Sequence, residues 1–164
     1  PMAPPPPRVV QVATGNAGKL TLRQLIADER FELVGVSTST ADRVGVDAGT
    51  LAGLDVTTGI TAVGSLDELI ALRPDVAVYC AMGDTRPVEA TKDVCRLLEA
   101  GIDVVTTADW ITGYHRDTNH PHPSGRRVSE LIAAACEAGG STFYGTGMNP
   151  GLNQILGVVC TADE

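Results

Sequence analysis

The sequence predicts an α/β domain with a doubly wound, mainly parallel sheet and helices on both faces. Apolar strand-like runs alternate with helix-like segments along most of the 164 residues, and this order is typical of parallel sheets with crossover helices. The run at 76–80 contains no polar residue, as expected of a strand covered on both faces. Glycine is abundant, with 18 residues, which suits tight turns and close backbone approaches.

The elements are predicted in order from hydrophobic periodicity and from turn residues. Ser65 and Glu68 have the spacing of a helix capping box, and Gly101 suits the end of a helix. The predicted strands are 8–13, 31–36, a short one within 56–63, 76–80, 102–105 and 141–144. The predicted helices are 19–29, 44–51, 66–72, 87–100 and 127–138. Polar loops are expected at 37–43 and 106–125. A glycine-rich turn is expected at 145–151, followed by a helix or a strand at 152–159.

Composition and charge restrict the organisation and the partners. Residues 1–7 are interpreted as a disordered proline-rich arm that includes an expression scar, and residues 8–164 as one domain. The net charge of −8 argues against a nucleic-acid partner. No apolar run is long enough to span a bilayer and no signal-peptide pattern occurs, so we expect a cytoplasmic protein without a membrane partner. The four cysteines form no C-x-x-C pair and are interpreted as buried, reduced thiols.

One glycine turn carries the strongest functional signal. Residues 13–18 read ATGNAG, which matches G-x-G-x-x-G with alanine in the first place. Gly15 would let a pyrophosphate approach the backbone, Gly18 would let the helix pack closely on the strand, and Ala13 is tolerable only with a negative φ. The motif follows a buried strand and opens a helix, so it predicts a Rossmann-type dinucleotide site; a purely structural turn is the alternative. The predicted phosphate-binding residues are Thr14, Gly15, Asn16, Ala17 and Gly18.

The end of the second strand indicates which nicotinamide cofactor is bound. No carboxylate directly follows Val36 to bind a ribose 2′-hydroxyl. The residues there are Ser37, Thr38 and Ser39, with Arg43 further on. Hydroxyls and a guanidinium suit a 2′-phosphate better, so NADP is favoured over NAD. A solvated loop position for Arg43 is the alternative.

Ligands of open α/β sheets bind beyond the carboxyl ends of the strands, and several other segments are predicted to end there. Their hydroxyls, amides and backbone groups are candidates for orienting the nicotinamide. These cofactor-binding candidates are Ala81, Met82, Gly83, Thr106, Thr107 and Asn149.

Four segments carry a resemblance to a known family: VVQVATGNAGK at 9–19, FELVGV at 31–36, DVVTTAD at 103–109 and FYGTGMNPG at 143–151. Together they resemble the N-terminal domain shared by dihydrodipicolinate reductase and 2,4-diaminopentanoate dehydrogenase. The second of these branches includes the native amine dehydrogenases. The resemblance implies an NAD(P)-dependent enzyme that interconverts an amine with an imine or ketone. It also implies a C-terminal domain, absent from this chain, that completes the substrate pocket and forms the homo-oligomer, so we expect a truncated chain that is inactive by itself.

The resemblance further implies a catalytic carboxylate near the end of the fifth strand, where this sequence has Asp109. An ionisable group beside a nicotinamide can act as a general base, whereas capping of the following turn is the alternative. His115, His120 and His122 lie with Asp117 in the long loop; we interpret this as an active-site loop or solvated segment and predict no metal site.

Cys80 is interpreted as a buried strand residue and not as a nucleophile. The predicted function is the cofactor domain of an NAD(P)-dependent oxidoreductase that acts on a small amine, imine or carbonyl compound. Dihydrodipicolinate reductase proper and a non-catalytic NADP-binding sensor or assembly module remain the alternatives.

Overall fold

The structure, a computed structural model, describes residues 4–83, 85–107 and 127–146. Its strands form a single six-stranded sheet with the order β3-β2-β1-β4-β5-β6, and all neighbouring strands are parallel. The strands are β1 (Arg8–Val12), β2 (Glu32–Ser37), β3 (Ala62–Val63), β4 (Val76–Tyr79), β5 (Asp103–Thr106) and β6 (Phe143–Gly145).

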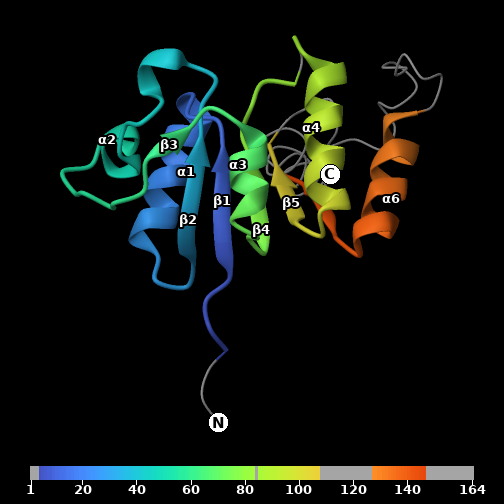
Figure 1. Cartoon of the computed structure of the whole chain (residues 1–164), viewed down its shortest axis with the longest axis horizontal. Helices are drawn as coiled ribbons and strands as arrows, with labels where there is room; N and C mark the ends of the chain where they lie inside the picture. The colour runs from blue at the N-terminus through green and yellow to red at the C-terminus, as the bar shows by residue number, and fades with distance from the viewer. Residues whose placement is uncertain (1–3, 84, 108–126, 147–164) are drawn as a thin grey trace, which may run out of the picture.

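Helices cover both faces of this sheet (Figure 1). One hydrophobic cluster joins β1, β4 and β5 to α3, α4 and α6, and a second joins β2 and β3 to α1 and α2. The predicted doubly wound sheet is therefore confirmed. The helices are α1 (Asn16–Ala27), the 3₁₀ turn η1 (Ala41–Arg43), α2 (Ala48–Ala52), α3 (Leu66–Ala71), α4 (Pro87–Glu99) and α6 (Val128–Gly139).

The strand order identifies the place where a ligand is expected. The chain runs outward from β1 to β2 and β3, returns to β4 beside β1, and then runs outward in the opposite direction to β5 and β6. This is the Rossmann strand order, whose direction reverses between β1 and β4. Loops leaving the carboxyl ends of these two strands diverge, so the crevice between them is the expected binding position.

The structure differs from the predicted elements mainly between β2 and α3. The predicted helix at 44–51 begins later, at Ala48, because Gly45 has a φ of 83° and Asp47 caps the helix by accepting from the Gly49 N–H. The strand predicted within 56–63 is limited to its last two residues. The preceding segment is instead a loop, in which the Asp47 carboxylate accepts from the Thr58 and Gly59 backbone N–H groups.

Residues 4–7 are exposed, and the Pro7 carbonyl accepts a hydrogen bond from the Glu32 N–H, so this residue continues the contact between β1 and β2. Among the described residues, no helix has the length and apolar character needed to cross a bilayer.

Candidate functional site

The turn between β1 and α1 presents backbone amides at the carboxyl edge of the sheet. Helix α1 has Gly15 as its N-cap, no side chain caps it, and its first turn contains no acidic residue. Gly15, Asn16 and Ala17 are exposed. The first N–H groups of a helix have no partner within the helix and carry a partial positive charge, so this turn is electrostatically suited to an anion.

The two glycines of the motif serve different purposes, as the sequence predicts. A Cβ on Gly15 would have no atom of the described residues within 4 Å, so open space faces Gly15 in this part of the chain. A Cβ on Gly18 would overlap the Ala13 carbonyl group and approach the Gln11 side chain. Gly18 therefore allows α1 to pack on the turn, whereas Gly15 leaves room on the side from which a phosphate would approach.

Ala13 corrects one expectation. The sequence predicts a negative φ here, but Ala13 has a φ of 75°. The left-handed conformation is strained for a residue with a Cβ and is the one that glycine adopts freely. The Ala13 N–H donates to the Ser37 carbonyl at 3.0 Å, and the Ala13 carbonyl accepts from the Gln11 amide. The surrounding hydrogen bonds therefore hold the turn in a shape for which its sequence is not ideal.

Gln11 is a site residue that the sequence analysis missed. It is the last residue but one of β1 and is fully buried. Its Nε2 donates to the Ala13 carbonyl at 2.9 Å and to the Gly18 carbonyl at 2.7 Å. Its Oε1 is buried and accepts no hydrogen bond from the described residues. Gln11 therefore ties both ends of the turn to the strand; a lone polar residue in an otherwise apolar run was the signal for it.

The end of β2 is bonded to the same turn. The Thr14 hydroxyl donates to the Thr38 hydroxyl at 3.2 Å, and both side chains are buried. Arg43 Nη1 donates to the Thr14 carbonyl at 2.7 Å and to the Thr14 hydroxyl at 3.2 Å. Arg43 is exposed but is not merely a solvated loop residue, because these bonds place its positive charge beside the turn. Ser37 is buried and Ser39 is exposed.

A hollow of about 340 Å³ lies at the same edge, beyond β1, β2 and β4. Its volume lies within the range of small-molecule sites, roughly 300–1,000 Å³. The predicted residues Ser37, Thr38, Ser39 and Ala81 contribute to it. Its charged residues come from α4 and the N-cap of that helix, and they were not predicted from the sequence. The complete lining is Val12, Ala13, Ser37, Thr38, Ser39, Gly64, Ser65, Leu66, Ala81, Arg86, Asp93 and Arg96.

Asp93 gives this hollow a carboxylate in a partly desolvated position. Burial raises its pKa, while the nearby Arg86 and Arg96 oppose that rise. The Tyr79 hydroxyl donates to Asp93 Oδ2 at 3.4 Å, and the Tyr79 ring is fully buried in β4. Burial, with the Asp93 charge as the second cause, raises the pKa of this phenol, which therefore stays protonated and remains a donor. Arg96 also forms an ion pair with Asp67 of α3.

The remaining predicted cofactor residues are distributed around this edge. Met82 is exposed, whereas Gly83 is buried. The buried Thr106 hydroxyl donates to the Tyr79 carbonyl at 3.0 Å, and this hydrogen bond between β5 and β4 stabilises the sheet. Thr107 is exposed at the end of β5. The predictions for Asp109, for Asn149 and for the histidine-containing loop fall outside the described residues.

The cysteines do not form a reactive site in the described part of the chain. Cys80, Cys95 and Cys136 are partly buried, and none of them forms a disulfide within the described ranges. Cys80 directly follows β4 instead of lying within it, and its Sγ is 3.7 Å from the Thr21 hydroxyl. Burial raises its pKa, which disfavours the nucleophilic thiolate. Within the described ranges, no group of three or more histidine, cysteine or acidic residues is placed to hold a metal ion.

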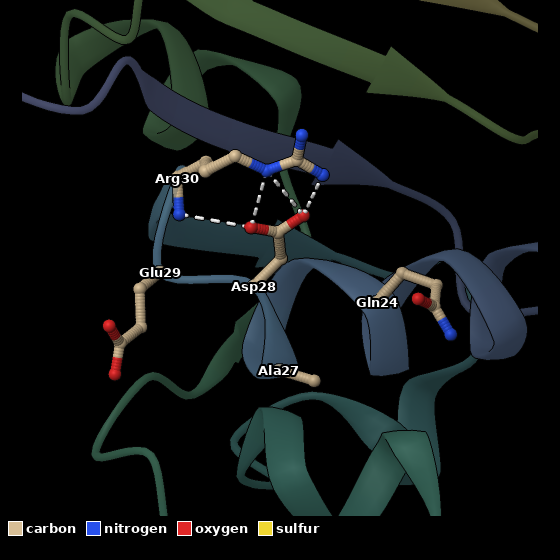
Figure 2. A pocket seen from close by; sticks show the side chains of 5 residues that line it. All are labelled: Gln24, Ala27, Asp28, Glu29 and Arg30. Atoms are coloured by element: carbon tan, nitrogen blue, oxygen red, sulfur yellow. Dashed lines mark hydrogen bonds and ion pairs between the residues drawn. The ribbon is translucent and has the colours of Figure 1, made fainter.

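A second hollow lies at the opposite end of α1 (Figure 2). Asp28 and Arg30 face one another there, with Arg30 Nη2 2.6 Å from Asp28 Oδ2. Hydrogen bonds from Arg30 lower the pKa of Asp28 to about 2. The lining residues are Gln24, Ala27, Asp28, Glu29 and Arg30, all from one segment of the chain.

Comparison with known proteins finds one similar sequence and several solved structures with a similar fold. The chain is 38% identical over 144 residues to an amine dehydrogenase from Streptomyces virginiae. The aligned residues cover 87% of this chain and 38% of the relative. The structure of an amine dehydrogenase from Mycobacterium smegmatis matches with a TM-score of 0.63 and 23% identity, over 86% of this chain and 39% of that one. GenD2 from gentamicin A biosynthesis, determined in complex with NAD, matches with a TM-score of 0.58 and 22% identity, over 88% and 35% of the two chains.

These comparisons confirm the resemblance to amine dehydrogenases, and the solved structures confirm the Rossmann-type fold. No family model matches the chain. The chain spans about 38% of the length of the curated relative. The resemblance to dihydrodipicolinate reductase stays a prediction.

Proposed function

We propose that this chain is the dinucleotide-binding part of an NAD(P)-dependent oxidoreductase that acts on a small amine, imine or carbonyl compound. When bound, the nicotinamide would accept or supply a hydride. The observation that carries the proposal is the Gly15–Ala17 turn, whose exposed amides open α1 at the carboxyl edge of the sheet. The similarity to an amine dehydrogenase over 87% of this chain supports the substrate class.

The chain's own residues fit a dinucleotide in three ways. The open space at Gly15 admits a pyrophosphate, and the helix N-terminus complements its charge. Gln11 holds the turn against β1, so that its amides keep one arrangement. The hollow beyond β1, β2 and β4 has the volume for an adenosine. Together these features bind and orient the cofactor before any chemistry takes place.

Binding calorimetry with NADP and NAD tests this proposal directly. Gly15→Val is expected to lower the affinity for both dinucleotides by about 100-fold or more, because the valine side chain would occupy the pyrophosphate position. The backbone at Gly15 is extended, with a φ of −69°, so the variant should fold normally. Ala27→Val, at the exposed far end of the same helix, is the matched control and should bind as the parent does. Equal affinity of Gly15→Val and the parent would contradict the proposal.

The residues beyond β2 support a preference for NADP. Arg43 is held beside the turn through one nitrogen, Nη1. Its remaining N–H groups can bind a 2′-phosphate, and Ser39 is exposed nearby at the hollow. Arg43→Ala is expected to weaken NADP by about 10- to 100-fold more than NAD, the range of a lost charge-assisted hydrogen bond. An equal loss of affinity for NADP and NAD would mean that Arg43 only supports the turn.

Two further proposals concern catalysis. Asp109 is proposed as the catalytic carboxylate, so that Asp109→Asn should reduce turnover far more than cofactor affinity. An enzyme should also show an amine- or carbonyl-dependent change in nicotinamide absorbance, whereas a sensor should bind the cofactor without turnover. The homo-oligomer, the cytoplasmic location and the absence of a nucleic-acid partner stay predictions.

A further inference from the structure

Asp93 occupies an unusual position for a surface carboxylate. It lies on α4, on the side that lines the hollow, and burial raises its pKa. A desolvated carboxylate is stabilised by hydrogen-bond donors. Within the described part of the chain, its one hydrogen-bond donor is the Tyr79 hydroxyl at 3.4 Å, a long contact that involves Oδ2 only. Asp93 Oδ1 therefore retains the capacity to accept a strong hydrogen bond.

The two arginines of the hollow do not take up this capacity. Arg96 forms its ion pair with Asp67 on α3. The backbone of Arg86 is the N-cap of α4, and its charge acts on Asp93 without a hydrogen bond in the described structure. The rest of the hollow combines apolar surface from Val12, Ala81 and Leu66 with the hydroxyl-bearing end of β2. Such a lining suits a flat heterocycle that carries a hydrogen-bond donor at one edge.

We propose that Asp93 determines base specificity: its carboxylate accepts a hydrogen bond from the exocyclic amino group of adenine and disfavours bases with a carbonyl at that position. The inference rests on the proposed dinucleotide function, since the base would enter this hollow from the neighbouring turn. Adenine carries an N6 amino donor, whereas hypoxanthine has a carbonyl oxygen at the same place. A carbonyl oxygen facing a carboxylate is repelled, and neither group supplies a hydrogen.

Binding calorimetry with two cofactors that differ in this one group tests the proposal. The probes are NAD and nicotinamide hypoxanthine dinucleotide. The parent chain is expected to bind the hypoxanthine form at least about tenfold more weakly. Asp93→Ala should lower the affinity for NAD to about that for the hypoxanthine form, because neither base then faces the Asp93 carboxylate. Asp93→Asn should also reduce the difference in affinity between NAD and the hypoxanthine form, since the asparagine amide can donate to the hypoxanthine carbonyl.

Two further variants separate base recognition from support of the fold. Glu89→Ala changes an exposed carboxylate one turn earlier on α4 and should preserve the parent preference. Tyr79→Phe retains the buried ring but removes the hydroxyl, and it should also retain a preference for NAD. Equal loss of the preference in Tyr79→Phe and Asp93→Ala would mean that Asp93 acts only through the packing around Tyr79, and this would overturn the proposal. Thermal unfolding of each variant verifies that it is folded.

The possible results distinguish failure of this inference from failure of the proposed function. If the parent binds both dinucleotides equally well, the role of Asp93 is wrong but the dinucleotide site stands. The same conclusion follows if Asp93→Ala keeps the parent preference. If the folded parent binds neither dinucleotide, the proposed function fails and the inference fails with it.

Discussion

The two edges of the sheet each carry a hollow, and the larger one is the poorer candidate for a ligand site. The hollow at the amino edge, shown in Figure 2, has a volume of about 760 Å³, against about 340 Å³ at the carboxyl edge. The larger hollow is lined by one short segment, in which Asp28 and Arg30 pair with each other. The smaller one gathers residues from strands and helices far apart in the sequence.

The two hollows differ in ways that identify a ligand site better than volume does. A site gathers residues from several elements, and some of its polar groups lack hydrogen-bond partners within the described protein. At the amino edge, the charged residues Asp28 and Arg30 already have partners. Among the described residues at the carboxyl edge, no side chain caps the start of α1, and Asp93 accepts one long hydrogen bond. A ligand there would supply partners that the described protein groups do not.

The largest expected effect comes from Gly18, which supports the carboxyl-edge site through packing. Gly18→Ala should lower the free energy of unfolding by about 3 kcal/mol, the upper part of the range for an overpacked position. The reason is that the new Cβ would overlap the Ala13 carbonyl group, a backbone group that is itself held by Gln11. Denaturant unfolding measures the loss. A stability equal to that of the parent would mean that α1 does not pack on the turn as described.

Gln11 should show the next largest effect. Gln11→Leu keeps the approximate volume but leaves the Ala13 and Gly18 carbonyls without the Gln11 amide donor. We expect a loss of about 2 kcal/mol in unfolding free energy and about tenfold weaker dinucleotide binding, because the turn is less well held. Denaturant unfolding and calorimetry on the same sample measure both. If affinity is unchanged while stability falls, Gln11 supports the strand and not the site.

Ala13 provides a change in the opposite direction. Ala13→Gly is expected to increase stability by about 1 kcal/mol, since glycine adopts a φ of 75° without strain. Dinucleotide binding should be retained, because the hydrogen bonds of the Ala13 backbone remain available. The midpoint of thermal unfolding tests this expectation. A lower midpoint for the glycine variant would contradict the strained conformation.

The amino edge should give the smallest effect. Arg30→Ala should return the pKa of Asp28 from about 2 toward its usual 3.8. Because the folded-state pKa is lowered, the stabilisation exists above pH 3.8 and is lost as the pH falls toward 2. Arg30 is exposed and Asp28 is only partly buried, so stability at neutral pH and dinucleotide affinity should both stay near the parent values. An NMR titration of the Asp28 carboxyl measures the pKa; a large loss of affinity would refute the contrast between the two edges.

The sequence predicts the sheet and the turn well because local patterns determine both. The apolar run at 76–80 and the glycine spacing at 15 and 18 report directly on β4 and on the start of α1. Asp93 and Arg96 have helical spacing, but only the tertiary fold shows that their side of α4 lines a hollow. The positive φ of Ala13 is likewise imposed by contacts with Gln11 and Ser37 rather than by local preference.

The most direct measurement of the central claim is an NMR titration of the backbone amides of this chain with NADP. The largest shifts are expected at Gly15, Asn16 and Ala17, with further shifts around Ser39 and Asp93 and little change from Gln24 to Arg30. Largest shifts at the far end of α1, or no shifts at the turn under saturating NADP, would contradict this claim.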